Sequence, residues 1–533
     1  MNKKLSLFLF APIIFFNLAN AQQFRGMGEV FNPELLAKTP QKIQISERSF
    51  RGMPSSSSLE QYAPTPGDQG NYGTCTAWAV GYGVATILYA KTHQITDKAL
   101  INKYAFSPTF LYEQIKQATD KDCQGGSSSI QALATLIEVG DATLKTAPYL
   151  CNVAPSELAK TEASNYKLAD AAVLFTQKGV SKNDVYYKQP QEAIDLAKKA
   201  IIEGSPISIS FQLPKSFFEI KTAVWTPDPQ EALGDWKHNS HAMCVVGYDD
   251  NVAGGAFRVM NSWGTNWGDK GFVWIKYDDF VRYCQMAIQP FANPFTKAPD
   301  EKPVPTPQPK PSPNPIPVPQ PSPIATVTLS GSMEFKLNTG EDMPVNRISS
   351  RNLVVEEEKA AKEDLVAYTM TGSYSSGTRF RFYLNVDQEA YIYAFATDLS
   401  GKINKILPFD DLVSTHVGAN TVVAFPSDTK VIKLDDNKGT DYLMILYAKE
   451  KLNMDELMMT MNNTKGGLSS KIMAALGDKL ISKNKIKYEG NKVGFSVNVK
   501  PGTRNLTVEN DSKTNEEPAT GSVVPLMIEI KHN

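Results

Sequence analysis

A proline repeat divides this chain of 533 residues into two parts. From Pro303 to Pro323 every second residue is proline. Proline lacks a backbone N–H and fixes φ, so the repeat can join neither a helix nor the interior of a sheet. It favours an extended spacer that would span roughly 65 Å at about 3.1 Å per residue. Because 533 residues also exceed what one core normally supports, we expect two folded bodies joined by a linker at residues 297–324.

The amino terminus has the pattern of an export signal. Residues 1–21 combine Lys3-Lys4, an apolar run from Leu5 to Phe16, and Ala19-Asn20-Ala21, which is typical of a cleaved signal peptide. The apolar run is too short for a membrane anchor. We therefore expect a secreted, periplasmic or cell-surface protein in which disulfides are permitted. A net charge of −1 gives no reason to expect nucleic acid as a partner.

Three separated stretches carry residues suited to thiol chemistry. They contain Cys75, His241 and Asn261, in that order along the chain. A neutral thiol is a poor nucleophile, so it needs a base such as an imidazole, and the imidazole needs a third group to fix its orientation. The residues after Cys75 predict a helix, whose amino-terminal dipole would favour a thiolate. The pattern predicts a thiol-protease active site.

The order Gln69, Cys75, His241, Asn261 resembles the papain family, and residues 261–272 match that family's signature almost letter for letter. The resemblance implies that the Gln69 side chain and the Cys75 N–H form the oxyanion hole. It implies that Asn261 orients His241 and that Trp263 shields their hydrogen bond from water. The loop containing Gly125 and Gly126 is similar to the family's substrate-binding loop, and Gly126 would pair there with the substrate main chain.

The chain also departs from the family pattern. Tyr72 replaces the usual disulfide cysteine and Thr76 replaces the tryptophan next to the nucleophile, as in a divergent bacterial branch. The Pro-Tyr segment that usually precedes a disulfide cysteine is followed here by Cys151, so the resemblance implies a Cys123–Cys151 disulfide. The Cys-to-His spacing is long, and residues 215–237 are an expected insertion. Cys244 more readily packs as a strand residue, and the pairing of Cys284 stays open.

Other readings remain for the same residues. His238 is a rival for the base, although the apolar run after His241 fits a buried strand better. The cleft could belong to an inactive peptide-binding protein, or the thioester could serve transpeptidation. No cofactor is expected, and the five histidines and the cysteine spacing predict no metal site. The expected partners are protein or peptide substrates.

The predicted fold class is α+β, with the two-lobe papain architecture of a helical lobe against a β-barrel-like lobe. Helical spacing occurs between Ser107 and Val139 and again from Gln191 to Glu203. Strands are predicted at residues 206–211, 241–248 and 257–261. The peptidase domain would occupy residues 59–296. Residues 22–58 would be an extension or short propeptide, with one short helix in residues 29–38 and a flexible joint at residues 55–58.

Residues 325–533 are predicted to form a β-rich accessory domain. Alternation predicts strands at residues 379–386, 391–395 and 442–447, and residues 468–480 favour an amphipathic helix. The region is similar to an uncharacterised β-rich module appended to bacterial secreted proteases. Its partner could be an envelope, a glycan or a protein. Tyr383 and Tyr393 could line such a surface, although packing in the core is the more common fate of these side chains.

Overall fold

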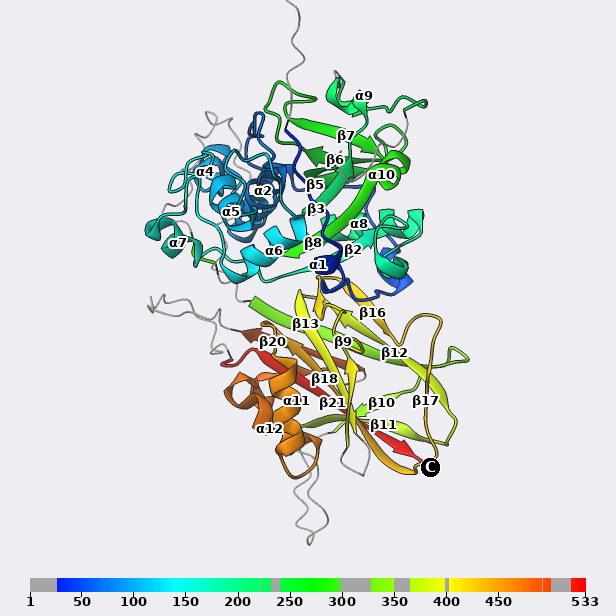
Figure 1. Ribbon diagram of the computed structural model, residues 1–533. Helices are drawn as coiled ribbons and strands as arrows, with labels where there is room; N and C mark the ends of the chain where they lie inside the picture. The colour runs from blue at the N-terminus through cyan, green and yellow to red at the C-terminus, as the bar shows by residue number, and fades with distance from the viewer. Residues whose placement is uncertain are drawn as a thin grey trace, which may run out of the picture.

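A computed structural model describes residues 26–220, 222–231, 240–294, 296–298, 327–348, 365–397, 402–490, 492–499 and 519–533. The expected signal peptide, the proline repeat and His238 lie outside these residues. The described residues form two bodies, drawn one above the other in Figure 1. The upper body holds the three stretches with Cys75, His241 and Asn261, and the lower body is the β-rich region. The α+β class is confirmed.

A cluster of helices forms one side of the upper body (Figure 1). The helices are α2 (Cys75–Ala77), the π-helix η3 (Trp78–Ala85), α3 (Thr86–Thr92), α4 (Lys98–Lys103), α5 (Pro108–Ile115), α6 (Ser129–Glu138) and α7 (Glu157–Ala163). The first three follow one another without a break, so Cys75 begins a long helix. Ser107 caps α5 by accepting from Phe110 N–H, and Pro108 occupies the first turn, where its missing N–H is harmless. The predicted helical stretch from Ser107 to Val139 is thus α5 and α6, joined by a loop.

A mixed sheet forms the other side. Its strands are β1 (Ser56–Ser58), β2 (Asp170–Thr176), β3 (Ile207–Gln212), β4 (Val224–Trp225), β5 (Ser240–Asp249), β6 (Ala256–Met260), β7 (Phe272–Lys276) and β8 (Cys284–Phe291). They are ordered β2-β8-β3-β5-β6-β7-β4, and β1 pairs with β5. The connecting helices are α8 (Pro190–Ile202), α9 (Lys215–Phe218) and α10 (Tyr277–Tyr283). The strands β3, β5 and β6 and the helix α8 confirm the predicted elements within a residue or two.

One local prediction is confirmed in part and one was wrong. The short helix predicted in residues 29–38 is α1, which covers only Pro33–Leu36 and is capped by the Asn32 side chain. Residues 55–58 are not a flexible joint, since β1 pairs Ser57 with Tyr248 on the long strand β5. The edge of β5 supplies the hydrogen-bond partners that the local serine-rich composition could not reveal.

The lower body is a sandwich of two sheets. The first has the order β10-β11-β21-β18-β13-β14 with β15 on β13, and the second has the order β16-β12-β9-β20-β19 with β17 on β12. Its strands are β9 (Val327–Leu337), β10 (Val345–Arg347), β11 (Val366–Tyr374), β12 (Arg379–Val386), β13 (Ala390–Thr397), β14 (Ile403–Leu407), β15 (His416–Val417), β16 (Thr421–Phe425), β17 (Ile432–Lys433), β18 (Gly439–Ala448), β19 (Lys487–Tyr488), β20 (Val493–Val499) and β21 (Val523–His532). The predicted strands are β12, β13 and β18.

The sandwich has two apolar layers. One lies between the sheets and includes Phe382 and Ile445, while the other lies beneath α11 (Met454–Asn463) and α12 (Leu468–Leu476). Tyr393 belongs to the second layer and is 1% exposed. Tyr383 is 6% exposed and is covered by the Arg48 guanidinium, 3.7 Å from its ring centre. Both side chains are buried, as the core-packing alternative expected.

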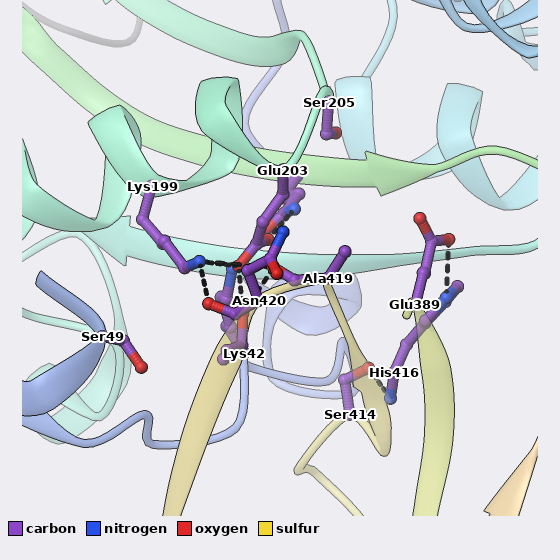
Figure 2. A network of polar contacts seen from close by, with 12 residues as sticks. Lys42, Ser49, Lys199, Glu203, Ser205, Glu389, Ser414, His416, Ala419 and Asn420 are labelled. Atoms are coloured by element: carbon purple, nitrogen blue, oxygen red, sulfur yellow. Dashed lines mark hydrogen bonds and ion pairs between the residues drawn. The ribbon is translucent and has the colours of Figure 1, made fainter. Parts of the chain in front are cut away.

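The N-terminal extension joins the two bodies. Gln41 bridges Val173 in the upper body and Val413 in the lower one, and Ile45 bridges Val423. Below these contacts lies a buried polar network, which Figure 2 shows between β16 and the end of α8. Residues 41–45 are therefore part of the folded structure.

Glu203 is the centre of that network. Its carboxylate lies 2.8 Å from Lys42 Nζ and accepts from Thr421 Oγ1 at 2.9 Å. Lys199 Nζ donates to the Asn420 carbonyl at 2.8 Å and lies 3.7 Å from Glu203 (Figure 2). Beside the network, the His416 ring stacks on Phe291 with ring centres 4.0 Å apart. The two bodies thus share specific polar and aromatic contacts.

Within the described residues, no helix has the length and apolar character to cross a membrane.

Candidate active site

Cys75 lies at the start of the long helix and is fully buried. Its Sγ accepts a hydrogen bond from Ala242 N–H at 3.5 Å. Ala242 follows His241 on β5, so the thiol faces the amino-terminal end of that strand. The π-helix immediately after Cys75 widens the helix, a feature that is frequent at functional sites. The structure therefore brings residue 75 of the helical side against residues 241 and 242 of the sheet.

The His241 ring is held in one tautomer. Its Nε2 lies 2.8 Å from Asn261 Oδ1, and the same oxygen accepts from Ser262 N–H at 2.8 Å. Because Oδ1 is the acceptor in both contacts, Nε2 carries the proton and Nδ1 keeps its lone pair. Nδ1 is buried and has no hydrogen-bond partner among the described residues. The ring thus presents a free basic nitrogen within the site.

Aromatic rings cover the contact between His241 and Asn261. Trp263 is fully buried, and its ring centre lies 4.8 Å from that of His241. The Phe218 ring stacks on the Trp263 ring, with ring centres 5.2 Å apart. Phe218 and the neighbouring Phe217 come from α9, inside the insertion predicted at residues 215–237. Helix α9 therefore helps to exclude water from the site, a role that its sequence position did not reveal.

Gln69 lies on the same side as Asn261. Its Oε1 accepts from Ser262 Oγ at 2.6 Å, which orients the amide. Its Nε2 then donates to two carbonyl oxygens, that of Tyr72 at 2.8 Å and that of Gly26 at 2.9 Å. Tyr149 Oη also donates to the Gln69 carbonyl at 2.9 Å. The Gln69 amide is thus fixed, and one of its two protons is directed at residue 26 of the same chain.

Cys123 and Cys151 form a disulfide, while Cys75, Cys244 and Cys284 are free and buried. The disulfide holds the loop that contains Gly125 and Gly126. Gly126 N–H donates to Tyr112 Oη at 3.0 Å. The next residue, Ser127, pairs through its main chain with residues 28 and 30 of the same chain.

Residues 26–30, here called the cleft segment, occupy the space between the two sides. The Gly28 carbonyl accepts from Ser127 N–H at 2.7 Å, and Val30 N–H donates to the Ser127 carbonyl at 2.9 Å. Gly28 N–H is hydrogen-bonded to Cys75 Sγ. Any side chain at residue 28 would clash, because a Cβ there would lie 1.9 Å from the Gly73 carbonyl oxygen. The cleft segment therefore covers Cys75, and a substrate cannot reach the thiol in this conformation.

The closed cleft disfavours both charged forms of the catalytic pair. Burial, with a contribution from the nearby Glu29 carboxylate, raises the pKa of Cys75 to about 12. Burial lowers the pKa of His241 to about 4, against the opposing effect of the Asn261 hydrogen bond. The helix dipole was expected to favour a thiolate, but desolvation outweighs it here. These pKa values favour a neutral thiol beside a neutral imidazole in this conformation.

Comparison with protein families agrees with this geometry. Residues 60–293 match the sequence model described as the papain family cysteine proteases. Over these residues the chain is similar to the papain family. Residues 373–451 match a domain of unknown function, DUF4384, which lies in the β-rich body. The family covers the helical side, the sheet and all four of the residues Gln69, Cys75, His241 and Asn261.

Individual relatives are distant. The chain is 26% identical over 226 residues to "Probable cysteine protease RDL2" of Arabidopsis thaliana, which covers 42% of this chain and 55% of that protein. It is 32% identical over 110 residues to a cathepsin L-like peptidase of Aedes aegypti, covering 20% of this chain and 32% of that protein. The structure of xylellain, a cysteine protease from Xylella fastidiosa, is similar over 51% of this chain and 96% of that one, with 19% identity and a TM-score of 0.39. The chain thus spans about half the length of the Arabidopsis relative.

Proposed function

We propose that this chain is an exported cysteine endopeptidase that hydrolyses peptide bonds through a thioester on Cys75. The proposal rests on one observation, the convergence of four side chains from three separate stretches. His241 Nε2 lies 2.8 Å from Asn261 Oδ1, and Gln69 is joined to the same turn through Ser262. Cys75 Sγ lies against the N–H that follows His241. The family match over residues 60–293 supports the same assignment.

The reaction follows from these positions. Cys75 Sγ attacks the carbonyl carbon of the substrate while its proton passes to His241 Nδ1, the nitrogen left free by the Asn261 contact. The oxygen that becomes negative accepts hydrogen bonds from Gln69 Nε2 and from the Cys75 N–H. Nδ1 then protonates the leaving amine, and water hydrolyses the thioester with His241 again as base. No cofactor takes part in these steps.

Export and domain division are parts of the same proposal. The pattern of residues 1–21 supports a cleaved signal peptide, and the Cys123–Cys151 disulfide is suited to an oxidising compartment. The peptidase domain would occupy residues 59–296 and the accessory domain residues 325–533. The accessory domain would position the peptidase on an envelope, glycan or protein partner.

The test uses the full mature chain in two forms. One carries Gly28→Val, which cannot keep the cleft segment over Cys75, and the other carries Cys75→Ala in addition. Cleavage of denatured casein and labelling by an irreversible peptide-epoxide thiol probe are measured under reducing conditions. We expect both in the first form and neither in the second. Products carrying an added amine would indicate transfer in place of hydrolysis, and a folded protein with neither signal would favour a peptide-binding protein.

A further inference from the structure

The Glu29 side chain fills a polar pocket beside the nucleophile. Its carboxyl is fully buried, with Thr76 Oγ1 at 2.7 Å, Ser129 Oγ at 2.8 Å and Ser210 Oγ at 2.8 Å. Ser129 N–H adds a fourth contact at 3.3 Å. Among the described residues no cationic side chain contacts this carboxyl. The pocket, here called the hydroxyl pocket, thus consists of Thr76, Ser129 and Ser210.

The hydroxyl pocket is built from the same elements as the active site. Thr76 follows Cys75 on the helix, and Ser210 on β3 pairs with Ala242 on β5. Ser129 opens α6, two residues after the Ser127 that pairs with the cleft segment. All three side chains are at least 95% buried, at 0%, 1% and 4% exposure. The pocket is therefore a fixed part of the peptidase body, and Glu29 is its internal ligand.

The pocket lies on the acyl side of the reacting bond. His241 must protonate the leaving amine, so the leaving half of a substrate lies toward His241, Trp263 and Gln69. The acyl half then lies toward Ser127, where the main chain of the cleft segment is paired. Glu29 follows Gly28, whose N–H contacts Cys75 Sγ, so the cleft segment runs from Cys75 toward the pocket, in the direction opposite to the acyl half of a substrate. The hydroxyl pocket thus receives a side chain about one residue away from the reacting carbonyl.

We propose that the hydroxyl pocket selects substrates that carry a glutamate side chain on the acyl side, next to the residue whose carbonyl Cys75 attacks. The inference rests on the proposed peptidase function. A leucine or phenylalanine there would leave the Ser129 and Ser210 hydroxyls and the Ser129 N–H buried without the partners that Glu29 supplies, while Thr76 Oγ1 would keep its contact with the Ser127 carbonyl. A lysine or arginine would bring only donors to a site that already donates. Aspartate is one methylene shorter and would not reach all the donors that Glu29 reaches.

The specificity test uses the Gly28→Val full chain and a peptide library randomised at each position on both sides of the cleaved bond. We expect kcat/KM at the position next to the attacked residue to be at least about tenfold higher for glutamate than for leucine, phenylalanine or lysine. Glutamine should fall in between. A preference for apolar or basic residues, or no preference, would overturn the inference. If Gly28→Val does not fold, Glu29→Arg places a cation in the hydroxyl pocket and serves as the second opened variant.

Two serines on β3 provide a matched pair of variants. Ser210→Ala removes a hydroxyl that contacts Glu29, whereas Ser208→Ala removes a buried hydroxyl with no hydrogen-bond partner among the described residues. We expect Ser210→Ala to reduce the ratio of kcat/KM for glutamate substrates over leucine substrates about tenfold. Ser208→Ala should leave the preference intact. Equal loss in both variants would contradict a specific role for the hydroxyl pocket.

A binding measurement separates the pocket from the chemistry. The peptide Gly-Met-Gly-Glu-Val-Phe, which repeats residues 26–31, is titrated calorimetrically into the Gly28→Val chain beside a peptide with leucine in place of glutamate. We expect at least about tenfold weaker binding of the leucine peptide. Equal binding would overturn the inference even if casein is cleaved. Preferential binding of the glutamate peptide without any cleavage or labelling would retain the pocket and reject the peptidase function.

Discussion

The side-chain amide of Gln69 donates a hydrogen bond to the Gly26 carbonyl at 2.9 Å. Gln69 is the residue expected to stabilise the oxyanion. In this structure the chain's own amino-terminal segment occupies one of its two N–H donors. Gly28 meanwhile covers Cys75, and Glu29 fills the hydroxyl pocket. Residues 26–30 therefore occupy the Gln69 donor, cover the Cys75 thiol and fill the hydroxyl pocket. In this conformation the proposed peptidase would be latent.

Opening the cleft segment should activate the protein. In Gly28→Val the new side chain meets the Gly73 carbonyl, because even a Cβ would lie 1.9 Å from that oxygen. We expect labelling of Cys75 by the epoxide probe to accelerate at least about tenfold, which corresponds to about 1.4 kcal/mol of lost segment binding. Gly490→Val is the matched control, since a Cβ there meets nothing within 4 Å. Equal labelling rates in both variants and the parent would show that the segment does not protect the thiol.

The latent state should weaken as the pH rises. Burial raises the pKa of Glu29 in the closed cleft above its ordinary value of 4.5, despite the hydrogen bonds from Thr76, Ser129 and Ser210. The stabilisation by the protonated carboxyl is therefore complete below pH 4.5 and is lost as the pH rises through the raised value. Glu29→Gln stays neutral and should retain the segment at higher pH.

The measurement for this effect is the labelling rate of Cys75 from pH 4 to pH 8, in the parent and in Glu29→Gln. Both proteins share the same thiol and imidazole, so the ratio of their rates isolates residue 29. We expect the labelling rate of the parent, divided by that of Glu29→Gln, to increase with pH. A constant ratio would mean that the Glu29 carboxyl does not control the closed state.

Gln69 should contribute to the chemical step. Removing one oxyanion donor typically lowers kcat by about 10²–10³. In the Gly28→Val background, Gln69→Ala should show such a loss in peptide hydrolysis while KM changes less. Thermal unfolding of both variants checks for structural damage, because Gln69 also binds Ser262 and Tyr72. A kcat within threefold of the Gly28→Val parent would contradict the proposed role.

Glu203 should hold the two bodies together. Burial alone would raise the pKa of its carboxyl, but Lys42 and Lys199 keep it below its ordinary value. Glu203→Ala leaves both lysines without their shared carboxylate inside the interface. We expect a loss of about 3–5 kcal/mol in the free energy of unfolding, measured with urea.

The comparison variant for the interface is Lys160→Ala, whose partner Glu157 is exposed at the surface of α7. Exposed ion pairs contribute about 0–1 kcal/mol, so this variant should unfold close to the parent. Equal midpoints for the Glu203 and Lys160 variants would contradict a structural role for the buried network.

Elements with a clear local pattern could be predicted from the sequence. The alternation in residues 379–386 gives β12, and the helical spacing after Gln191 gives α8. The flanking motifs identified four candidate site residues, and the structure brings them together. They are Gln69, Cys75, His241 and Asn261. In these cases the information is contained in a short window of sequence.

The cleft segment could not be predicted in the same way. Its contacts are long-range, since Glu29 binds Ser129 and Ser210, which lie 100 and 181 residues further along the chain. Residue 28 must be glycine because of the Gly73 backbone, and nothing in the local sequence indicates that approach. The pairing of β1 with β5 has the same character, because the hydrogen-bond partners of the serine-rich segment lie almost 200 residues further along the chain.

The central claim is that Cys75 is the nucleophile of a peptidase whose cleft is closed by residues 26–30. Its most direct test is the cleavage of denatured casein by three full-length mature chains: the parent, Gly28→Val, and Gly28→Val with Cys75→Ala. We predict low activity in the first, strong activity in the second and none in the third. Casein cleavage that persists without Cys75, or its absence in a folded Gly28→Val chain, would contradict this account.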